Sequence, residues 1–211
     1  MKISILILTH KRPELFKRCI NSVITAYNKF PLKNNVEILV NNDSNDIQEI
    51  YSNLSIIYSY NNYNLGNLYF DLFKRANGEY VYFLEDDDYI SEDFFEIFSQ
   101  YNQDIMYFNY KPYKWMLHFT EFFKYTNNVY KDKEHFLQNY DPWNFQFSQI
   151  CFKKKCLNDF PTDDNLQNDF EIFKRLKGSF ININKFIFTQ TTDGGDNISF
   201  NKGKKCNHCN Q

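Results

Sequence analysis

Four consecutive carboxylates follow an apolar stretch in "YVYFLEDDDYI", where residues 80–84 are large and apolar and residues 85–88 are all acidic. Charges at this spacing repel one another, which raises carboxylate pKa values and destabilises a fold unless a cation or hydrogen-bond donors offset the repulsion. Two such carboxylates facing one cleft make a hard oxygen site suited to Mg²⁺ or Mn²⁺. The alternative is a solvated loop whose acidic residues cap a helix beginning near Ser91.

The position of this acidic run depends on the elements before it, which alternate between strand and helix. Apolar runs bounded by polar residues predict strands, and apolar residues at helical spacing predict helices. This order is typical of a Rossmann-type α/β fold, a doubly wound and mostly parallel sheet flanked by helices. We expect strands at 3–8, 36–40, 55–60 and 80–84, and helices at 13–28, 43–53 and 66–76, the last followed by a left-handed cap at Gly78.

Three polar segments are expected at one edge of this sheet. Ligands in open α/β sheets bind outside the carboxyl ends of the strands. The acidic residues 85–88 follow the fourth strand, residues 9–12 follow the first, and residues 41–44 follow the second. The sequence therefore predicts a ligand site where these three segments meet.

The second half of the chain is less regular. The aromatic stretch 111–130 fits either a helix or a hairpin. No internal repeat or linker divides the chain, and 211 residues suffice for one sizeable core, so we expect a single domain. We expect a helix at 91–104, a strand at 104–110, a strand turning into a short helix at 147–157, a helix at 168–178, a strand at 180–188 and a loop at 191–200.

The composition argues against a nucleic-acid partner. The 24 Lys and Arg residues against 26 Asp and Glu give a net charge of -2, without a global basic field. The aromatic fraction of 19% is typical of AT-rich genomes, such as those of some viruses and low-GC bacteria. The opening apolar stretch "ISILIL" is far shorter than the ~20 residues of a membrane span and has no signal-peptide cleavage site. We therefore expect no membrane span and a cytoplasmic location, in the host cytoplasm if the protein is viral.

The five cysteines are odd in number and spread along the chain, so a disulfide framework is not expected. Cys206 and Cys209 flank His208 in "CNHC", which is half of a zinc site. The alternative is a flexible tail over 201–211, because the surrounding Lys, Asn and Gly residues favour disorder. Both interpretations stay open at this point.

Three segments of the first half resemble a known family. "ILILTHKRPELFKRCINSV", "VEILVNNDSND" and "NYNLGNLYFDLFKRANGEYVYFLEDDDYI" are similar to the nucleotide-binding half of the family 2 glycosyltransferases, the large inverting group with the GT-A fold. The resemblance implies a GT-A-like single domain. Residues 1–99 would form its donor-binding half, residues 100–200 its acceptor-binding half, and residues 201–211 a flexible tail.

The resemblance also implies roles for residues of the three polar segments at this edge of the sheet, called the rim below. Asp87 is the expected ligand of a Mn²⁺ or Mg²⁺ cofactor, supported by Glu85 and Asp88. Asn42 stands where the family usually has Asp, and its amide oxygen can accept the same hydrogen bond from the base. The donor nucleotide is expected to contact Thr9, Arg12, Asn41, Asn42 and Asp86.

A later segment, "FSQICFKKKCLNDFPTDDNLQNDFEIFKRLKG", is similar to the acceptor side of the same family. Asp169 falls where the family keeps its catalytic base. Trp143 is the expected acceptor contact, because aromatic rings stack on the apolar faces of sugars. Tyr69 departs from the family pattern, since it stands near a position where an Arg is common.

The expected function is a metal-dependent, inverting transfer of a sugar from a nucleotide-diphosphate donor to a hydroxyl of a glycan or glycoconjugate. A UDP-sugar is the expected donor, with UDP-glucose as a base-rate choice. The chain would then be a hexosyltransferase, either alone or as one domain of a longer enzyme. Two alternatives stay open: a non-catalytic glycan- or nucleotide-binding module with a structural Ca²⁺ site, and a nucleotidyltransferase. The glycine-free "THKRPE" disfavours the latter.

Overall fold

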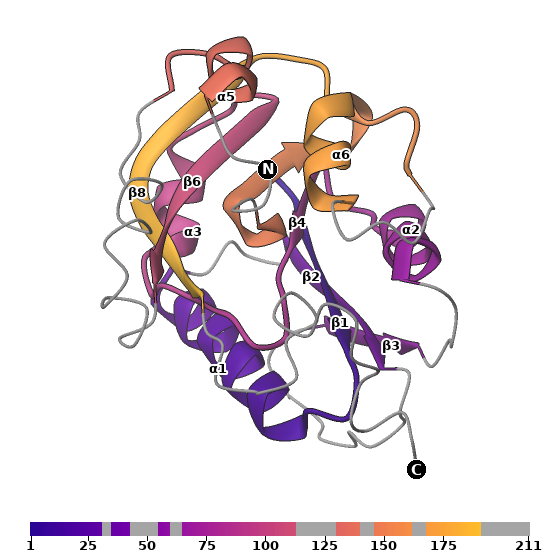
Figure 1. Ribbon diagram of the computed structural model, residues 1–211. Helices are drawn as coiled ribbons and strands as arrows, with labels where there is room; N and C mark the ends of the chain where they lie inside the picture. Colours follow the sequence, from indigo (N-terminus) through magenta and orange to yellow (C-terminus); the bar gives the residue numbers. More distant parts are fainter. Residues whose placement is uncertain are drawn as a thin grey trace.

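Strand β1, Ile3–Thr9, lies inside an eight-stranded sheet, and helices cover both faces of that sheet (Figure 1). The computed structural model describes residues 1–30, 35–42, 55–59, 65–112, 130–139, 146–161 and 168–190. After β1 the elements are α1 (Pro13–Lys29), β2 (Val36–Asn42), β3 (Ser55–Ser59), α2 (Leu65–Arg75), β4 (Tyr80–Phe83), β5 (Tyr89–Ile90), α3 (Phe94–Ser99), β6 (Ile105–Pro112), α5 (Lys133–Asn139), the 3₁₀ turn η3 (Phe147–Gln149), β7 (Ile150–Lys153), the 3₁₀ turn η4 (Lys154–Cys156), α6 (Asn168–Arg175) and β8 (Phe180–Gln190).

The strand order is β3-β2-β1-β4-β7-β6-β8-β5. Strands β3, β2, β1 and β4 are parallel, so their carboxyl ends meet at one edge. Strand β7 is antiparallel to both β4 and β6, whereas β8 is parallel to β6. The expected α/β fold with a mostly parallel sheet is confirmed, and β7 joins the second half of the chain directly to β4.

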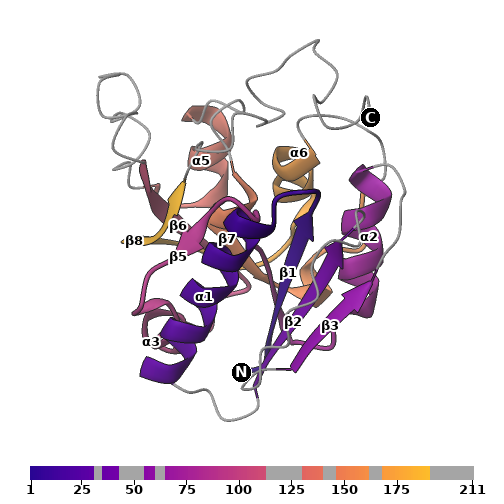
Figure 2. The same cartoon turned by 90° about the horizontal axis from the view of Figure 1, so that it is seen from below.

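The two faces of the sheet carry separate hydrophobic clusters, because successive side chains of a strand point to opposite faces. Ile5 of β1 packs in the cluster that includes Phe16 of α1 and residues of α3. Leu6, its neighbour, packs in the cluster that includes Leu72 of α2 and Phe173 of α6. Figure 2 shows α1 and α3 on one side of the sheet and α2 and α6 on the other. The fold is therefore a three-layer sandwich.

Most elements expected from the sequence are confirmed to within two residues at each end. Helix α1 begins at Pro13, where the missing N–H is tolerated in the first turn, and buries residues at helical spacing. Strand β2 runs on to Asn42 and therefore contains the polar residues that were expected to follow it. Of the helices in the described ranges, none combines the length and the apolar character that crossing a bilayer requires.

Two details differ from expectation. The helix expected at 91–104 is only α3, because the N–H of Ser91 still donates to the carbonyl of Ile187 next to the edge strand β5, and residues after Ser99 leave the helix before β6. Gly78 is not a left-handed cap, since among the described glycines only Gly178 has a positive φ. A Cβ on Gly78 would lie 2.5 Å from the backbone nitrogen of Ser4, so close packing against β1 requires glycine there.

Several expectations fall outside the described residues. These are the helix at 43–53, the stretch at 113–129, the loop at 191–200 and the tail with Cys206 and Cys209. The three cysteines within the described residues, Cys19, Cys151 and Cys156, are buried free thiols.

A buried carboxylate ties three segments together at the amino end of the sheet. Glu37 of β2 is 7% exposed and accepts hydrogen bonds from the Ser4 hydroxyl of β1 and from the backbone N–H groups of Asn77 and Gly78. Burial opposes ionisation of Glu37, but the hydrogen bonds from Ser4 and Asn77 outweigh it and lower the pKa. The α2–β4 connection is therefore anchored to β1 and β2.

Replacing Glu37 with Ala is expected to destabilise the protein by about 2 kcal/mol or more, because it leaves buried donors without an acceptor. The folded pKa is below the ordinary value of 4.5, so the contribution of Glu37 is present above pH 4.5 and is lost as the pH falls through the folded pKa. Urea unfolding at pH 7 and at lower pH measures both effects.

The matched control is Glu92→Ala, which removes a surface ion pair with Lys29 whose two side chains are 66% and 53% exposed. Such pairs contribute about 1 kcal/mol or less. Equal losses in the two variants would contradict the anchoring role of Glu37.

Candidate active site

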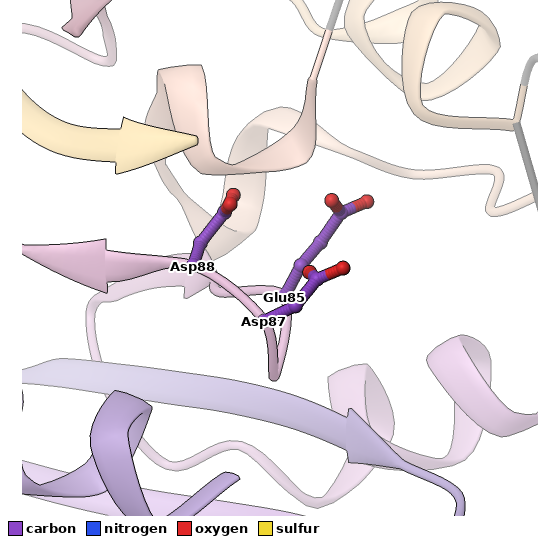
Figure 3. A group of neighbouring side chains, drawn as sticks. All are labelled: Glu85, Asp87 and Asp88. Carbon is purple, nitrogen blue, oxygen red and sulfur yellow. The ribbon is translucent and has the colours of Figure 1, made fainter. Parts of the chain in front are cut away.

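The acidic residues form a tight turn at the carboxyl end of β4. The N–H of Asp88 donates to the carbonyl of Glu85 at 3.0 Å, which closes the turn before β5. Figure 3 shows the side chains of Glu85, Asp87 and Asp88 on the same side of this turn. Each offers a carboxylate oxygen, and the three oxygens lie within 4.8 Å of one another. The turn thus gathers charges that alternation along a straight strand would have separated.

Arg12 is the cation that faces this turn. Its guanidinium lies 2.6 Å from Asp86 Oδ1 and 3.2 Å from Asp87 Oδ2, and its side chain is 25% exposed. Lys11, with φ of 49°, makes the sharp bend between β1 and α1 that brings Arg12 to the turn. The guanidinium is thus paired to carboxylates at the carboxyl edge of the sheet, and the contact of Arg12 with a nucleotide stays a prediction.

The carboxylates of the turn are held in a poorly solvated place. Asp86, Asp87 and Asp88 are each at most 4% exposed, whereas Glu85 keeps a partly exposed surface. Burial raises the pKa of Glu85 to about 8, repulsion from Asp87 adds to this rise, and Arg12 opposes it. Burial likewise raises the pKa of Asp86 to about 7 against the pull of Arg12. The ion pairs with Arg12 therefore leave much of the repulsion uncompensated.

The ends of β1 and β2 form the neighbouring wall of the site. Thr9 and Asn42 are register partners on these strands, and both are buried. Asn41 accepts a hydrogen bond from the Ser59 hydroxyl of β3 at 2.9 Å. The Thr9 hydroxyl and both carboxylate oxygens of Asp86 are buried, and within the described part of the chain the polar partners of Asp86 are Arg12, at 2.6 Å, and Thr9. Polar atoms placed in this way can also bind a polar ligand.

Asp169 joins the site from the second half of the chain. It lies in the first turn of α6, and its Oδ1 accepts the N–H of Phe170 at 2.9 Å. Burial raises the pKa of Asp169 to about 7. Its charge is near enough to Glu85 to raise the pKa of that carboxyl further. The structure therefore brings Asp169 and the acidic turn into one electrostatic neighbourhood, although 84 positions separate Asp169 from Glu85 in the sequence.

Tyr69 of α2 stands near the position where the family commonly has an Arg. Its ring packs on Phe83 of β4 and Phe147 of η3, with centroids 5.4 and 4.9 Å away. Burial raises the pKa of Tyr69 well above its ordinary value, and the charges of Glu85 and Asp169 add to the effect. A neutral phenol therefore occupies this position.

Two residues of the site are not evident from the sequence. Arg18 of α1 donates from Nη2 to the carbonyl of Asp87 at 2.7 Å. Ser148 of η3 donates to Asp88 Oδ2 at 3.2 Å. Arg18 resembles an ordinary surface residue of an amphipathic helix, and Ser148 is a small residue before a strand. A cation one and a half helical turns after Arg12 is the only signal that could have indicated Arg18.

The described residues do not test the expected acceptor contact. Trp143 lies outside them. Tyr107, Tyr130 and Phe136 pack on one another inside the core, with ring centroids 4.5 to 5.9 Å apart. These aromatic residues stabilise α5 against the sheet and do not line a surface.

The three clustered carboxylates fit a divalent cation. Their oxygens are hard ligands, and Mg²⁺ and Mn²⁺ prefer such ligands. A divalent charge would offset the repulsion that raises the pKa of Glu85. The ligand atoms and the electrostatics therefore both favour a divalent cation.

Known structures share this architecture. S. aureus TarS (residues 1–349) is similar with a TM-score of 0.66 at 17% identity, covering 96% of this chain and 63% of that chain. Its complex with UDP-GlcNAc gives 0.64 at 19% identity, covering 91% and 59%. Mannosyltransferase PcManGT from Pyrobaculum calidifontis, in complex with GDP-Man and Mn²⁺, gives 0.67 at 13% identity, covering 90% and 56%. The chain thus spans less than two thirds of each neighbour's length.

The likeness to these structures shows that the sheet and its flanking helices have a fold of the GT-A type. The chain belongs to glycosyl transferase family 2, whose family model matches residues 4–159. The comparison with curated proteins gives no match. The family resemblance noted in the sequence is confirmed.

Replacing Glu85 with Gln is expected to stabilise the metal-free protein at pH 8. The folded pKa of Glu85 is about 8 against an ordinary 4.5, so the folded state binds the extra proton and stability falls as the pH rises between these values. Gln removes this loss, and we expect a Tm about 2–4 °C higher at pH 8 and little change at pH 4. Thermal unfolding in the presence of EDTA measures it.

Glu79→Gln is the control, since Glu79 is an exposed residue at the opposite end of β4. A Tm that depends on pH in the same way in wild type and Glu85→Gln would contradict the electrostatic origin of the effect.

Proposed function

We propose that this protein is a metal-dependent, inverting glycosyltransferase that moves a sugar from a nucleoside-diphosphate donor to a hydroxyl of a glycan or glycoconjugate. The observation that carries the proposal is the buried acidic turn at the carboxyl end of β4, with Asp169 in its electrostatic neighbourhood, in a chain of glycosyl transferase family 2. Such a turn is costly to fold and is suited to a ligand that brings positive charge.

The donor nucleotide would occupy the rim formed by β1 and β2. Thr9 and Asp86 supply buried polar atoms at this rim, and Asn42 lies beside Thr9. Asn41 and Arg12 border the same rim. The TarS complexes with UDP-GlcNAc and UDP support a UDP-sugar, and UDP-glucose is the first donor to test.

A Mn²⁺ or Mg²⁺ ion would be held by Glu85, Asp87 and Asp88, and when bound it would supply positive charge to the diphosphate leaving group. PcManGT was solved with Mn²⁺, which supports this assignment. Arg12 balances part of the charge of Asp86 and Asp87 on the nucleotide side. Arg12 and the ion would together neutralise the negative charge of the acidic turn and the diphosphate.

Asp169 would accept the proton of the acceptor hydroxyl as that oxygen attacks the anomeric carbon. Its pKa of about 7 matches proton transfer near neutral pH, because a general base works best when its pKa is close to the working pH. Attack from the face opposite the departing diphosphate inverts the anomeric configuration. Trp143 is proposed as an acceptor contact.

The proposal also covers the cellular location and the partners of the protein. We propose action in the cytoplasm, which is the host cytoplasm if the protein is viral, on a glycan acceptor and without a nucleic-acid partner. If this chain is one domain of a longer enzyme, the other domains would contribute to acceptor choice.

Release of nucleoside diphosphate from a donor panel tests the proposal. We expect release from a UDP-sugar, with UDP-glucose, UDP-GlcNAc and GDP-mannose compared in the presence of mixed glycan acceptors. EDTA should abolish release, and excess Mn²⁺ should restore it. Absence of release with every donor, together with intact Mn²⁺ binding, would favour a binding module over an enzyme.

Asp169→Asn is expected to lower kcat about 10³-fold while leaving UDP affinity within about twofold, because the amide keeps the shape but cannot accept the proton. In the wild type, kcat/KM should rise with pH and level off above about 7, where Asp169 is deprotonated. Initial rates across pH and calorimetric titration with UDP measure these effects.

Asp159→Asn is the matched control, since Asp159 is an exposed residue ion-paired with Arg175 of α6. It should leave kcat and the pH profile unchanged. Retained turnover in Asp169→Asn would reject the base assignment.

A further inference from the structure

Helix α1 contacts the acidic turn through two arginines that act in different ways. Arg12 faces the carboxylates of Asp86 and Asp87. Arg18 instead donates to the backbone carbonyl of Asp87 at 2.7 Å, and its guanidinium lies 5.4 Å from the ring centroid of Tyr89, just after the turn. Arg18 therefore fixes the path of the backbone that carries the clustered carboxylates.

The opposite side of the turn is tied to the second half of the chain. The Ser148 hydroxyl accepts the N–H of Glu85 at 3.4 Å and donates to Asp88 Oδ2 at 3.2 Å. Ser148 is itself fully buried, and its carbonyl accepts the Tyr82 hydroxyl of β4 at 2.8 Å. This serine thus joins the first and the last of the three clustered carboxylate residues.

We propose that Arg18 and Ser148 are positioning residues that clamp the acidic turn from both sides and set its affinity for a divalent cation, although neither belongs to the clustered carboxylates. The proposal rests on the cation site of the proposed function. Three carboxylates that repel one another separate unless the backbone is fixed, and a preformed cluster binds a cation without first paying for that ordering.

The sign of the effect separates this role from a simple charge effect. Arg18 carries a positive charge near the turn, so neutralising it strengthens cation binding if only Coulomb repulsion matters. Neutralising it weakens cation binding if the guanidinium acts by holding the carbonyl of Asp87. The two explanations therefore predict opposite changes in one measured constant.

The test is titration of the full chain with Mn²⁺ alone, followed by calorimetry and by the EPR signal of free Mn²⁺. We expect Arg18→Met to weaken Mn²⁺ binding about tenfold, as substitutions around metal ligands commonly do. Arg75→Met is the control, because Arg75 pairs with Asp71 at the end of α2, before the amino end of β4, whereas the acidic turn follows the carboxyl end of β4. Unchanged or tighter binding in Arg18→Met would overturn the proposal, whereas failure of the wild type to bind Mn²⁺ would overturn the cation site itself.

Two further variants test the same proposal if Arg18→Met is not properly folded, as judged by the absence of cooperative unfolding. Arg18→Lys keeps the positive charge but replaces the planar guanidinium with a compact ammonium group, so its Mn²⁺ affinity should fall below that of wild type. Ser148→Ala removes both contacts of the hydroxyl and should weaken Mn²⁺ binding, while Ser99→Ala on α3, whose hydroxyl bonds only within its own helix turn, should not. Wild-type affinity in both Arg18→Lys and Ser148→Ala would overturn the proposal.

Discussion

Repulsion among carboxylates at the carboxyl end of β4 is the constraint on which the site depends. Glu85, Asp87 and Asp88 lie close together in a place with little water, so their charges are expensive without a partner. Arg12 offsets part of this cost, and the remaining repulsion makes the turn receptive to a divalent cation. The repulsion among the carboxylates thus weakens the fold locally and at the same time favours binding of a divalent cation.

Buried acidic residues at the two ends of the sheet have pKa shifts in opposite directions. At the amino end, Glu37 accepts several hydrogen bonds, and its pKa is lowered. At the carboxyl end, Asp86 is also buried, but the ion pair with Arg12 compensates its charge only in part, and its pKa is raised. Fully compensated polar groups stabilise a fold, whereas partly compensated ones mark the places where a fold departs from its stability optimum for function.

Strand β4 lies at the junction of the two halves of the molecule. Strand β1 lies on one side of it and brings Thr9 and Arg12, while β7 lies on the other side and brings Ser148. Because β7 is antiparallel to β4, η3, which precedes β7, lies next to the acidic turn. The site is therefore assembled around one strand end from segments that are far apart in the chain.

The sequence by itself determined the alternation of strands and helices, the parallel first half, and the placement of Thr9, Asn42 and the acidic run at one edge, because apolar periodicity and strand polarity are local properties. The family resemblance pointed to Asp169. Only the tertiary structure decided the shortening of α3 by β5 and the contacts of Arg18 and Ser148 with the turn. Those contacts join residues 60 or more positions apart, and their partners are set by how β7 and α1 pack around β4, which local pattern does not encode.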